Sequence, residues 1–491
     1  MPKTTHGRTT NKNGRKAPRV RVGKDSNHSP GTLRVRMYRI GFGDFFLVTL
    51  PSPDGPQHIL IDCGVTTGKT GKGDIGTIKS AVRDMAKETD GRLALIIVTH
   101  RHMDHIIGFS RCAEQFTKFT VDAIWMPYWE TEYAQKVQDF QADLHGLASD
   151  LRAAALAADE NQDTREILAI VENATGVSSE GPGGGTNAES LALLKTGLKV
   201  KPEYYYKGQI PKLPAALTKA GLGAQILGPP PPEEVAFLNL KDLKKGVGQY
   251  LDHATQAASR SAKKLMPFGK EFICGPEGYP PNVFREWAPR RRRRLPDFSK
   301  RHSKALEEAV KNAMPQALLL AAKKLDSVLN NQSLVVLFTW KGKNLLFAGD
   351  AQAGNWEYWL YDIDKPIKDP STERLDKRGA EILSSLHFYK VGHHGSTNAT
   401  PISAVDAMGH DFVSMCSTQA DTFGTVSNNS EVPRQPLLNA LSRKSTLVRS
   451  DQIDATVDGR TISRVKGTPS APGKPKQGMF KVGSCYIDYF F

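Results

Sequence analysis

The feature that most constrains this chain is a run of metal-ligand residues directly after an apolar segment. The segment Leu93–Val98 predicts a buried strand, and it leads into His100, His102, Asp104 and His105 in the pattern HxHxDH. Imidazole and carboxylate groups are the ligands that first-row divalent metals take from proteins. Because a strand fixes the first ligand and the loop after it can bring the others together, the run predicts a metal-binding loop at a strand end.

The spacing within this run favours two metal ions over one. His100 and His102 are two positions apart and can share one side of an extended segment. Asp104 and His105 are adjacent, so they point elsewhere, toward a second ion. The alternative is a polar loop with three unrelated histidines, but the chain has only 13 histidines in 491 residues, which argues against chance clustering.

Three further strand ends carry suitable side chains. Asp350 follows an apolar segment after a glycine, and its two carboxylate oxygens could bridge two ions. His393 and His394 follow another such segment, and either could complete the second metal. Asp62 ends a third, where we expect it to orient a histidine ligand or the metal water. Taken alone, Asp62 could equally be a turn cap.

The order of these motifs is similar to that of the metallo-β-lactamase-fold hydrolases. Five further segments resemble the hydrolase domain of competence DNA-channel proteins of the ComEC family, namely Arg39–Asp44, Leu60–Gly64, Asn330–Val335, Leu346–Asp350 and Lys390–Ser396. The resemblance covers about 33–128, 222–230 and 330–460 and leaves the helical middle uncovered. It implies an α/β fold, specifically a four-layer αββα metallo-β-lactamase sandwich, here with a large helical insertion.

The resemblance also implies two divalent metal ions, zinc or manganese, and a ligand set. That set is His100, His102, Asp104, His105, Asp350 and His394. His100 and His102 would hold one ion. Asp104, His105 and His394 would hold the other, and Asp350 would bridge the two ions. His394 is preferred to His393 because it directly precedes a glycine, which leaves His393 to contact substrate or support the ligands. Catalytic roles are assigned to Asp104, Asp62 and His393.

One departure concerns the first ion, for which the superfamily usually supplies a separate third histidine. Only His145, His253 and His302 lie in the interval where it is expected, and none follows a strand and precedes a glycine. Each is expected to be an ordinary helix or loop residue. The first ion would then be weakly held, or its coordination would be completed by water or substrate.

Composition and patterning divide the chain into five parts. We expect a disordered basic arm over 1–31, the first half of the fold over 32–128, a mostly helical insertion region over 129–330 with a returning core strand near 222–228, the second half over 331–466, and a linker with a C-terminal strand over 467–491. The arm holds eight Lys and Arg residues against one acid and almost no large apolar residue, which is typical of disorder.

The charge balance favours a polyanionic partner. The formal net charge is +15 and the pI is about 9.4, which suits nucleic acid, with DNA preferred, or an anionic surface, and also a merely soluble basic protein. A run of five arginines could pair phosphates, namely Arg290, Arg291, Arg292, Arg293 and Arg294. It could also be a solvated loop or dock an acidic protein. Trp125, Tyr128 and Trp129 could stack bases or serve as packing.

Other sequence features bear on location. Five widely spaced cysteines without a CxxC pair indicate a reducing compartment. The N-terminus is polar and basic, unlike a secretory signal, and no stretch approaches the ~18 consecutive apolar residues of a membrane span. These features predict a cytoplasmic protein without a membrane span.

Two adjacent metal ions suit hydrolysis, because they activate a water and hold both the attacking and the leaving oxygen. Together with the basic charge and the DNA-processing relatives, this predicts a metal-dependent phosphodiesterase, a nuclease acting on DNA. Two alternatives remain open. One is a small-molecule phosphoesterase, and the other is a partner-regulated effector subunit whose helical insertion docks another protein.

Overall fold

The computed structural model describes seven stretches of the chain, which are 31–66, 75–177, 185–237, 316–361, 375–426, 430–452 and 479–491. The predicted basic arm, apart from its last residue, lies outside the described residues. So do the arginine run Arg290–Arg294 and most of the predicted linker.

The chain is an α/β protein with two main sheets. In the described residues the first sheet has eight strands in the order β15-β16-β1-β2-β3-β5-β7-β8. Its strands are β1 (Arg34–Tyr38), β2 (Phe45–Leu50), β3 (Gln57–Cys63), β5 (Leu95–Ile97), β7 (Ile124–Pro127), β8 (Glu203–Tyr205), β15 (Met479–Val482) and β16 (Tyr486–Phe490). The strands from β3 to β8 run parallel to one another, so their carboxyl ends lie at one edge.

The second sheet has six described strands in the order β14-β13-β12-β11-β10-β9. They are β9 (Leu222–Gly228), β10 (Val335–Trp340), β11 (Lys343–Phe347), β12 (Phe388–Lys390), β13 (Phe412–Cys416) and β14 (Ser445–Arg449). Strands β11 to β14 are parallel, whereas β9, β10 and β11 pair antiparallel. The strand predicted near 222–228 is therefore the edge strand β9. A small third sheet joins β4 (Arg92–Leu93) and β6 (Thr120–Val121).

The main core lies between the two large sheets. Phe46 and Trp125 of the first sheet and Phe338 and Phe347 of the second belong to one buried cluster, and the Phe46 and Phe347 rings lie 6.1 Å apart. Strands with one face in such a core are rich in apolar side chains at alternating positions. Each of these aromatic side chains stabilises the fold by about 1.5–3 kcal/mol through burial, so this core fixes the two sheets relative to each other.

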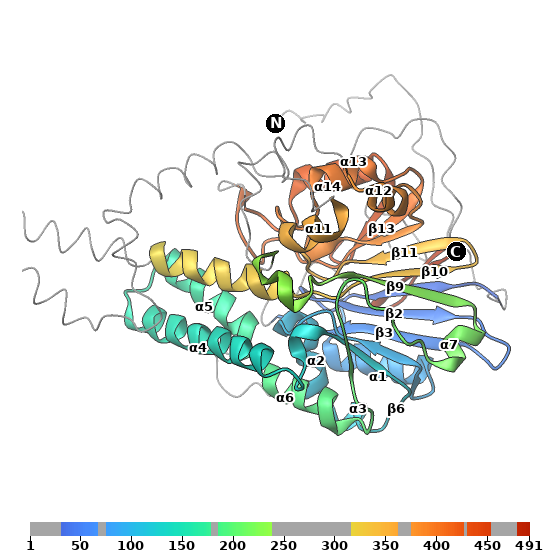
Figure 1. The fold of residues 1–491 in the computed structure, drawn as a ribbon, viewed down its shortest axis with the longest axis horizontal. Helices are drawn as coiled ribbons and strands as arrows, with labels where there is room; N and C mark the ends of the chain where they lie inside the picture. Colours follow the sequence, from blue (N-terminus) through green and yellow to red (C-terminus); the bar gives the residue numbers. More distant parts are fainter. Residues whose placement is uncertain are drawn as a thin grey trace, which may run out of the picture.

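Helices bury apolar stripes against the sheets (Figure 1). The first sheet receives α1 (Ile78–Glu88) and α2 (Met103–Arg111), and the second receives α11 (Ala353–Leu360), α12 (Lys377–Ser384), α13 (Ile402–Ala407) and α14 (Gln435–Ser442). Helix α1 begins at Thr77, whose hydroxyl accepts from the Ser80 N–H in a capping box. Its buried residues Ile78, Val82 and Met85 recur at helical spacing.

A group of three helices projects to one side of the sheets (Figure 1). It consists of α4 (Gln135–Ala157), α5 (Gln162–Thr175) and a helix over 316–330, which we call the insertion helix. Leu151 of α4, Ile167 and Val171 of α5, and Leu325 and Leu329 of the insertion helix are buried together. The sequence predicts helix over 130–172 and 304–329, and the observed helices overlap these ranges, although α5 continues to Thr175 and the insertion helix to 330.

One local prediction is wrong, and one strand is missed. The sequence predicts one strand over 479–491, but the structure has a hairpin of β15 and β16, because Gly483 and Ser484 turn the chain between them. The short strand β8 is not predicted at all. Its three residues are too few to show a period, and only pairing with β7 makes them a strand. In the described residues, no helix has the length and apolar character needed to cross a membrane.

Candidate metal centre

The candidate centre lies where strands of both sheets end. Strand β5 leads to His100, β11 leads to Asp350, and β12 leads to His393 and His394. The two sheets approach closely here, because Gly349 adopts φ +53° and a Cβ on it would lie 2.8 Å from the Thr99 Cβ. Only glycine fits that approach, which explains the Gly-Asp order at the end of β11.

Four buried side chains meet at this edge. Ligand atoms of Asp104, His105, Asp350 and His394 all lie within 4.8 Å of one another, and we call these residues the buried cluster. His394 Nε2 is 2.9 Å from Asp104 Oδ2, and Asp350 Oδ2 lies 3.1 Å from His105 Nε2 and 3.3 Å from His394 Nε2. Asp350 thus stands between the two histidines, and the first half of the chain supplies two members while the second half supplies the other two.

The buried cluster fits a divalent cation. Asp104 Oδ1, His105 Nε2, Asp350 Oδ2 and His394 Nε2 are all buried and have no hydrogen-bond partner of adequate geometry. Polar atoms in such surroundings are costly unless they are paired. Two imidazole nitrogens and two carboxylates form a donor set that zinc and manganese accept. Buried His and Asp groups here could therefore hold a metal ion.

Outer contacts orient both histidines of the buried cluster. Asp62 Oδ2 accepts from His105 Nδ1 at 2.7 Å, and its carboxylate is held by the Thr99 N–H at 2.8 Å and the Thr99 hydroxyl at 2.6 Å. His394 Nδ1 donates to the Ser417 carbonyl at 2.7 Å. Each contact leaves Nε2 facing the centre, as metal-binding histidines require. Asp62 has the contacts of an orienting carboxylate, whose function remains a prediction.

The carboxylates govern protonation in the buried cluster. Burial lowers the pKa of His394, but Asp350 and Asp44 outweigh it and raise that pKa to about 10. Burial is likewise outweighed at His105, whose pKa is raised well above its usual value by Asp350 and Asp62. Burial alone would raise the pKa of Asp104, but the neighbouring histidines outweigh it and lower that pKa to about 2. Two protonated imidazoles therefore face two carboxylates without a metal.

His100 and His102, which we call the histidine pair, are arranged differently. His100 Nε2 lies 3.0 Å from His102 Nδ1, so the two rings bond to each other. Burial and the neighbouring histidines lower the pKa of His100 well below its usual value, and burial lowers the pKa of His102 to about 4. Within the described residues the histidine pair does not join a group of three mutually close ligands. The shared ion expected for these two residues therefore stays a prediction.

His393 lies beside the buried cluster. Its Nε2 is 4.0 Å from Asp350 Oδ2, and its side chain is 19% exposed, whereas that of His394 is fully buried. Its Nδ1 lies 2.6 Å from the Ser396 hydroxyl. Both histidines adopt positive φ, +42° and +52°, which costs a non-glycine residue about 1 kcal/mol or more each. This strained turn puts His394 inside the cluster and leaves His393 facing solvent.

Sequence reasoning missed a buried ion pair under the cluster. Lys390 Nζ pairs with Asp44, lies 3.3 Å from Asp350 Oδ1 and donates to the Gly349 carbonyl at 2.9 Å. Burial acts against the charge of Lys390, but Asp44 and Asp350 raise its pKa. A lysine inside an otherwise apolar strand was the available signal. The pair holds one oxygen of Asp350, while the other oxygen faces His105 and His394.

Asp326 of the insertion helix was also missed. Its Oδ1 lies 3.9 Å from His102 Nε2, and its Oδ2 accepts from the Asn330 side chain at 2.9 Å. Burial, together with Asp104 and Asp350, raises the pKa of Asp326 to about 7. Nothing in the local sequence marks this residue, because only tertiary packing of the helix brings it to the centre.

The remaining predicted residues lie elsewhere. His145 is on α4, and His253 and His302 lie outside the described residues. Trp125 and Trp129 are 0% and 3% exposed, so they pack in the interior and present no ring face for a base to stack on. The packing alternative therefore holds for these two tryptophans.

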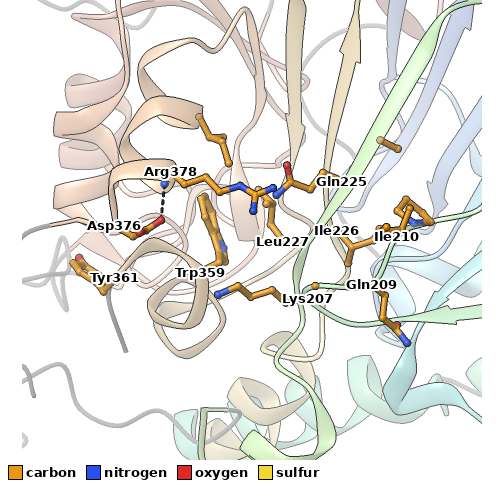
Figure 2. Close-up of a pocket in the computed structure, with 15 residues that line it drawn as sticks. Lys207, Gln209, Ile210, Gln225, Ile226, Leu227, Trp359, Tyr361, Asp376 and Arg378 are labelled. Carbon is orange, nitrogen blue, oxygen red and sulfur yellow. Dashed lines mark hydrogen bonds between the residues drawn. The ribbon is translucent and has the colours of Figure 1, made fainter. Parts of the chain in front are cut away.

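A separate cleft of about 490 Å³ lies between β9 and helices α11 and α12 (Figure 2). Its lining includes Lys207, Gln225, Trp359 and Arg378, none of which belongs to the buried cluster. Lys207 is already engaged, because its ammonium donates to the Tyr358 carbonyl at 2.6 Å. The cleft is thus distinct from the candidate centre.

A comparison with protein-family models and a search of curated proteins found no match to this chain.

Proposed function

We propose that this chain is a metal-dependent hydrolase of phosphodiesters, a nuclease acting on DNA. The observation that carries the proposal is the convergence of Asp104 and His105, from the first turn of α2, with Asp350 and His394, from strand ends of the second sheet, so that their buried ligand atoms lie within 4.8 Å of one another. The two sheets with outer helices support the further proposal that the fold is a four-layer αββα metallo-β-lactamase sandwich with a large helical insertion.

Each residue of the centre would have its own role in such a reaction. Divalent zinc or manganese, when bound, supplies a Lewis acid and lowers the pKa of a water to about 7. The buried cluster would hold the ion. Asp62 keeps His105 in one tautomer, and Lys390 neutralises one oxygen of Asp350 from below. His393 is the partly exposed histidine at the centre and is positioned to contact a substrate phosphate.

Charge supports a polyanionic substrate. The net charge of +15 attracts DNA at long range, and this attraction weakens as salt rises. Arg101 at the centre is engaged by Glu130, with bonds of 2.7 and 2.8 Å, so it is not free for a phosphate in this arrangement. Substrate contacts must therefore involve other basic residues, for which Arg290–Arg294 stay a prediction outside the described residues.

The test is cleavage of plasmid and single-stranded DNA by the purified chain with Mn²⁺ or Zn²⁺, beside elemental analysis. Asp104→Ala should lose cleavage and metal together. Asp143→Ala is the matched control, because Asp143 is an exposed carboxylate of α4 away from the centre. Metal binding without DNA cleavage, but with hydrolysis of bis-p-nitrophenyl phosphate, would indicate a small-molecule phosphoesterase and not a nuclease. A protein that binds no metal and cleaves neither substrate would contradict the proposal.

A further inference from the structure

The insertion helix reaches the candidate centre at one residue. Asp326 Oδ1 faces His102 Nε2 at 3.9 Å. That nitrogen is buried and has no hydrogen-bond partner. The other ring nitrogen of His102, Nδ1, contacts His100. Nitrogen and oxygen donors at about 2.0–2.2 Å from one metal ion lie about 3.4 Å apart in tetrahedral geometry and about 4.2 Å apart when they are opposite each other. The 3.9 Å gap between His102 and Asp326 lies between these values, so ligation in tetrahedral geometry requires the two side chains to move about 0.5 Å closer.

The position of Asp326 is fixed by the surrounding structure. Its second oxygen accepts from Asn330 one turn later, which sets the plane of the carboxylate. Leu325 and Leu329, on either side, are buried against α4 and α5. The chain then enters the second sheet, where the Leu334 N–H donates to the Thr99 carbonyl at 2.8 Å, directly before His100. Asp326 and the metal loop are therefore held in one arrangement.

The helical group contacts the metal loop at further points. The Asp104 N–H donates to the Asn173 side chain of α5 at 3.2 Å. Asn187, at the start of α6 (Asn187–Ala192), donates to the Arg101 carbonyl at 2.8 Å and the Asn173 carbonyl at 3.0 Å. The insertion thus forms one wall of the centre, and Asp326 is the acidic side chain of the insertion helix that faces His102.

We propose that Asp326 is a metal ligand supplied by the helical insertion, and that it shares with His102 a second divalent ion beside the one held by the buried cluster. The inference deepens the proposed function and rests on its metal centre. The ligands are one imidazole and one carboxylate, a set suited to manganese or zinc. The Asp326 side chain is 22% exposed against 1% for His102, so this second ion lies on the solvent side and exchanges more readily.

The test is titration of the chelator-treated full chain with Mn²⁺ by calorimetry. The wild type should bind two ions in two steps. Asp326→Asn keeps the shape and the Asn330 contact but weakens carboxylate ligation, and it should bind one ion or bind the second at least about 10-fold more weakly. Asp326→Glu should retain two. Asp143→Asn is the matched control in the same helical group, and circular dichroism checks that each variant is folded.

The outcomes separate this inference from the proposed function. Two ions bound by Asp326→Asn with wild-type affinities would overturn the role of Asp326. A wild type that binds a single ion, lost in Asp104→Asn and unchanged in Asp326→Asn, would also overturn it and leave the proposed hydrolase standing. A wild type that binds no ion would overturn both.

Discussion

The buried cluster and the histidine pair are neighbours, with the His100 and His105 rings 4.1 Å apart, yet different parts of the fold support them. The cluster combines two side chains from the first turn of α2 with two that follow strands of the second sheet, backed by Asp62, Lys390 and Ser417. The pair has its mutual contact, a contact between His100 Nδ1 and the Thr99 hydroxyl at 3.2 Å, and the acidic residue of one helix facing it. The cluster is therefore held by both halves of the fold, whereas the pair depends on the insertion for its one acidic neighbour.

The largest expected effect is the loss of activity when the cluster loses its central carboxylate. Asp350→Ala should reduce DNA cleavage by at least about 10³-fold, because the metal-activated water is lost. Cleavage rate and metal content are measured together, with Asp143→Ala as the control. If Asp350→Ala kept wild-type cleavage, the cluster would not be the catalytic half of the centre.

The second largest effect is expected from loss of the ion pair between Lys390 and Asp44, which supports the cluster. Lys390→Met should lower the free energy of unfolding by about 3–5 kcal/mol, because it removes the ammonium that pairs with the buried carboxylate of Asp44 and contacts Asp350. Urea unfolding of the metal-free protein measures it. The double variant Lys390→Met/Asp44→Asn should regain part of the loss, since it also removes a buried charge. Equal stability of Lys390→Met and wild type would show that the cluster does not depend on this support.

Proton release should distinguish the two positions. Around pH 7 the raised pKa values keep His105 and His394 protonated, so binding at the cluster must displace about two protons, and affinity should rise up to about 100-fold per pH unit. At the second position His102, with a pKa of about 4, is neutral around pH 7, and Asp326, with a pKa of about 7, can release at most one proton, so the second step should release fewer protons than the first. Calorimetry in buffers of different ionisation enthalpy counts the protons. Equal proton release in both binding steps would contradict this difference between the buried cluster and the second position.

The smallest effect is expected from the outer carboxylate. Asp62→Asn should weaken metal binding at the cluster by about 10–100-fold, because His105 loses the group that fixes its ring. The step assigned to His102 and Asp326 should keep its affinity. Calorimetric titration with Mn²⁺ measures both. Weakening of both steps to the same degree would mean that Asp62 supports the whole loop and not one ligand.

The sequence predicts those parts of the centre that depend on local order. HxHxDH, Gly-Asp and His-His each follow an apolar strand, and strand ends meet at a sheet edge, so Asp104, Asp350 and His394 could be named in advance. Most strands of both sheets followed from apolar runs for the same reason. Asp326, Lys390 and Asp44 could not be placed, because their contacts depend on how a helix, a strand and a turn from separate regions pack. The hairpin at the C-terminus likewise depends on pairing with β1.

The division of the buried cluster between the two halves of the chain bears on biosynthesis. Asp104 and His105 leave the ribosome long before Asp350 and His394, and neither pair alone offers the full donor set. Metal uptake at this position should therefore be a late event, which follows the docking of the second sheet on the first. A nascent chain that stops before β12 lacks His394 and therefore offers an incomplete donor set.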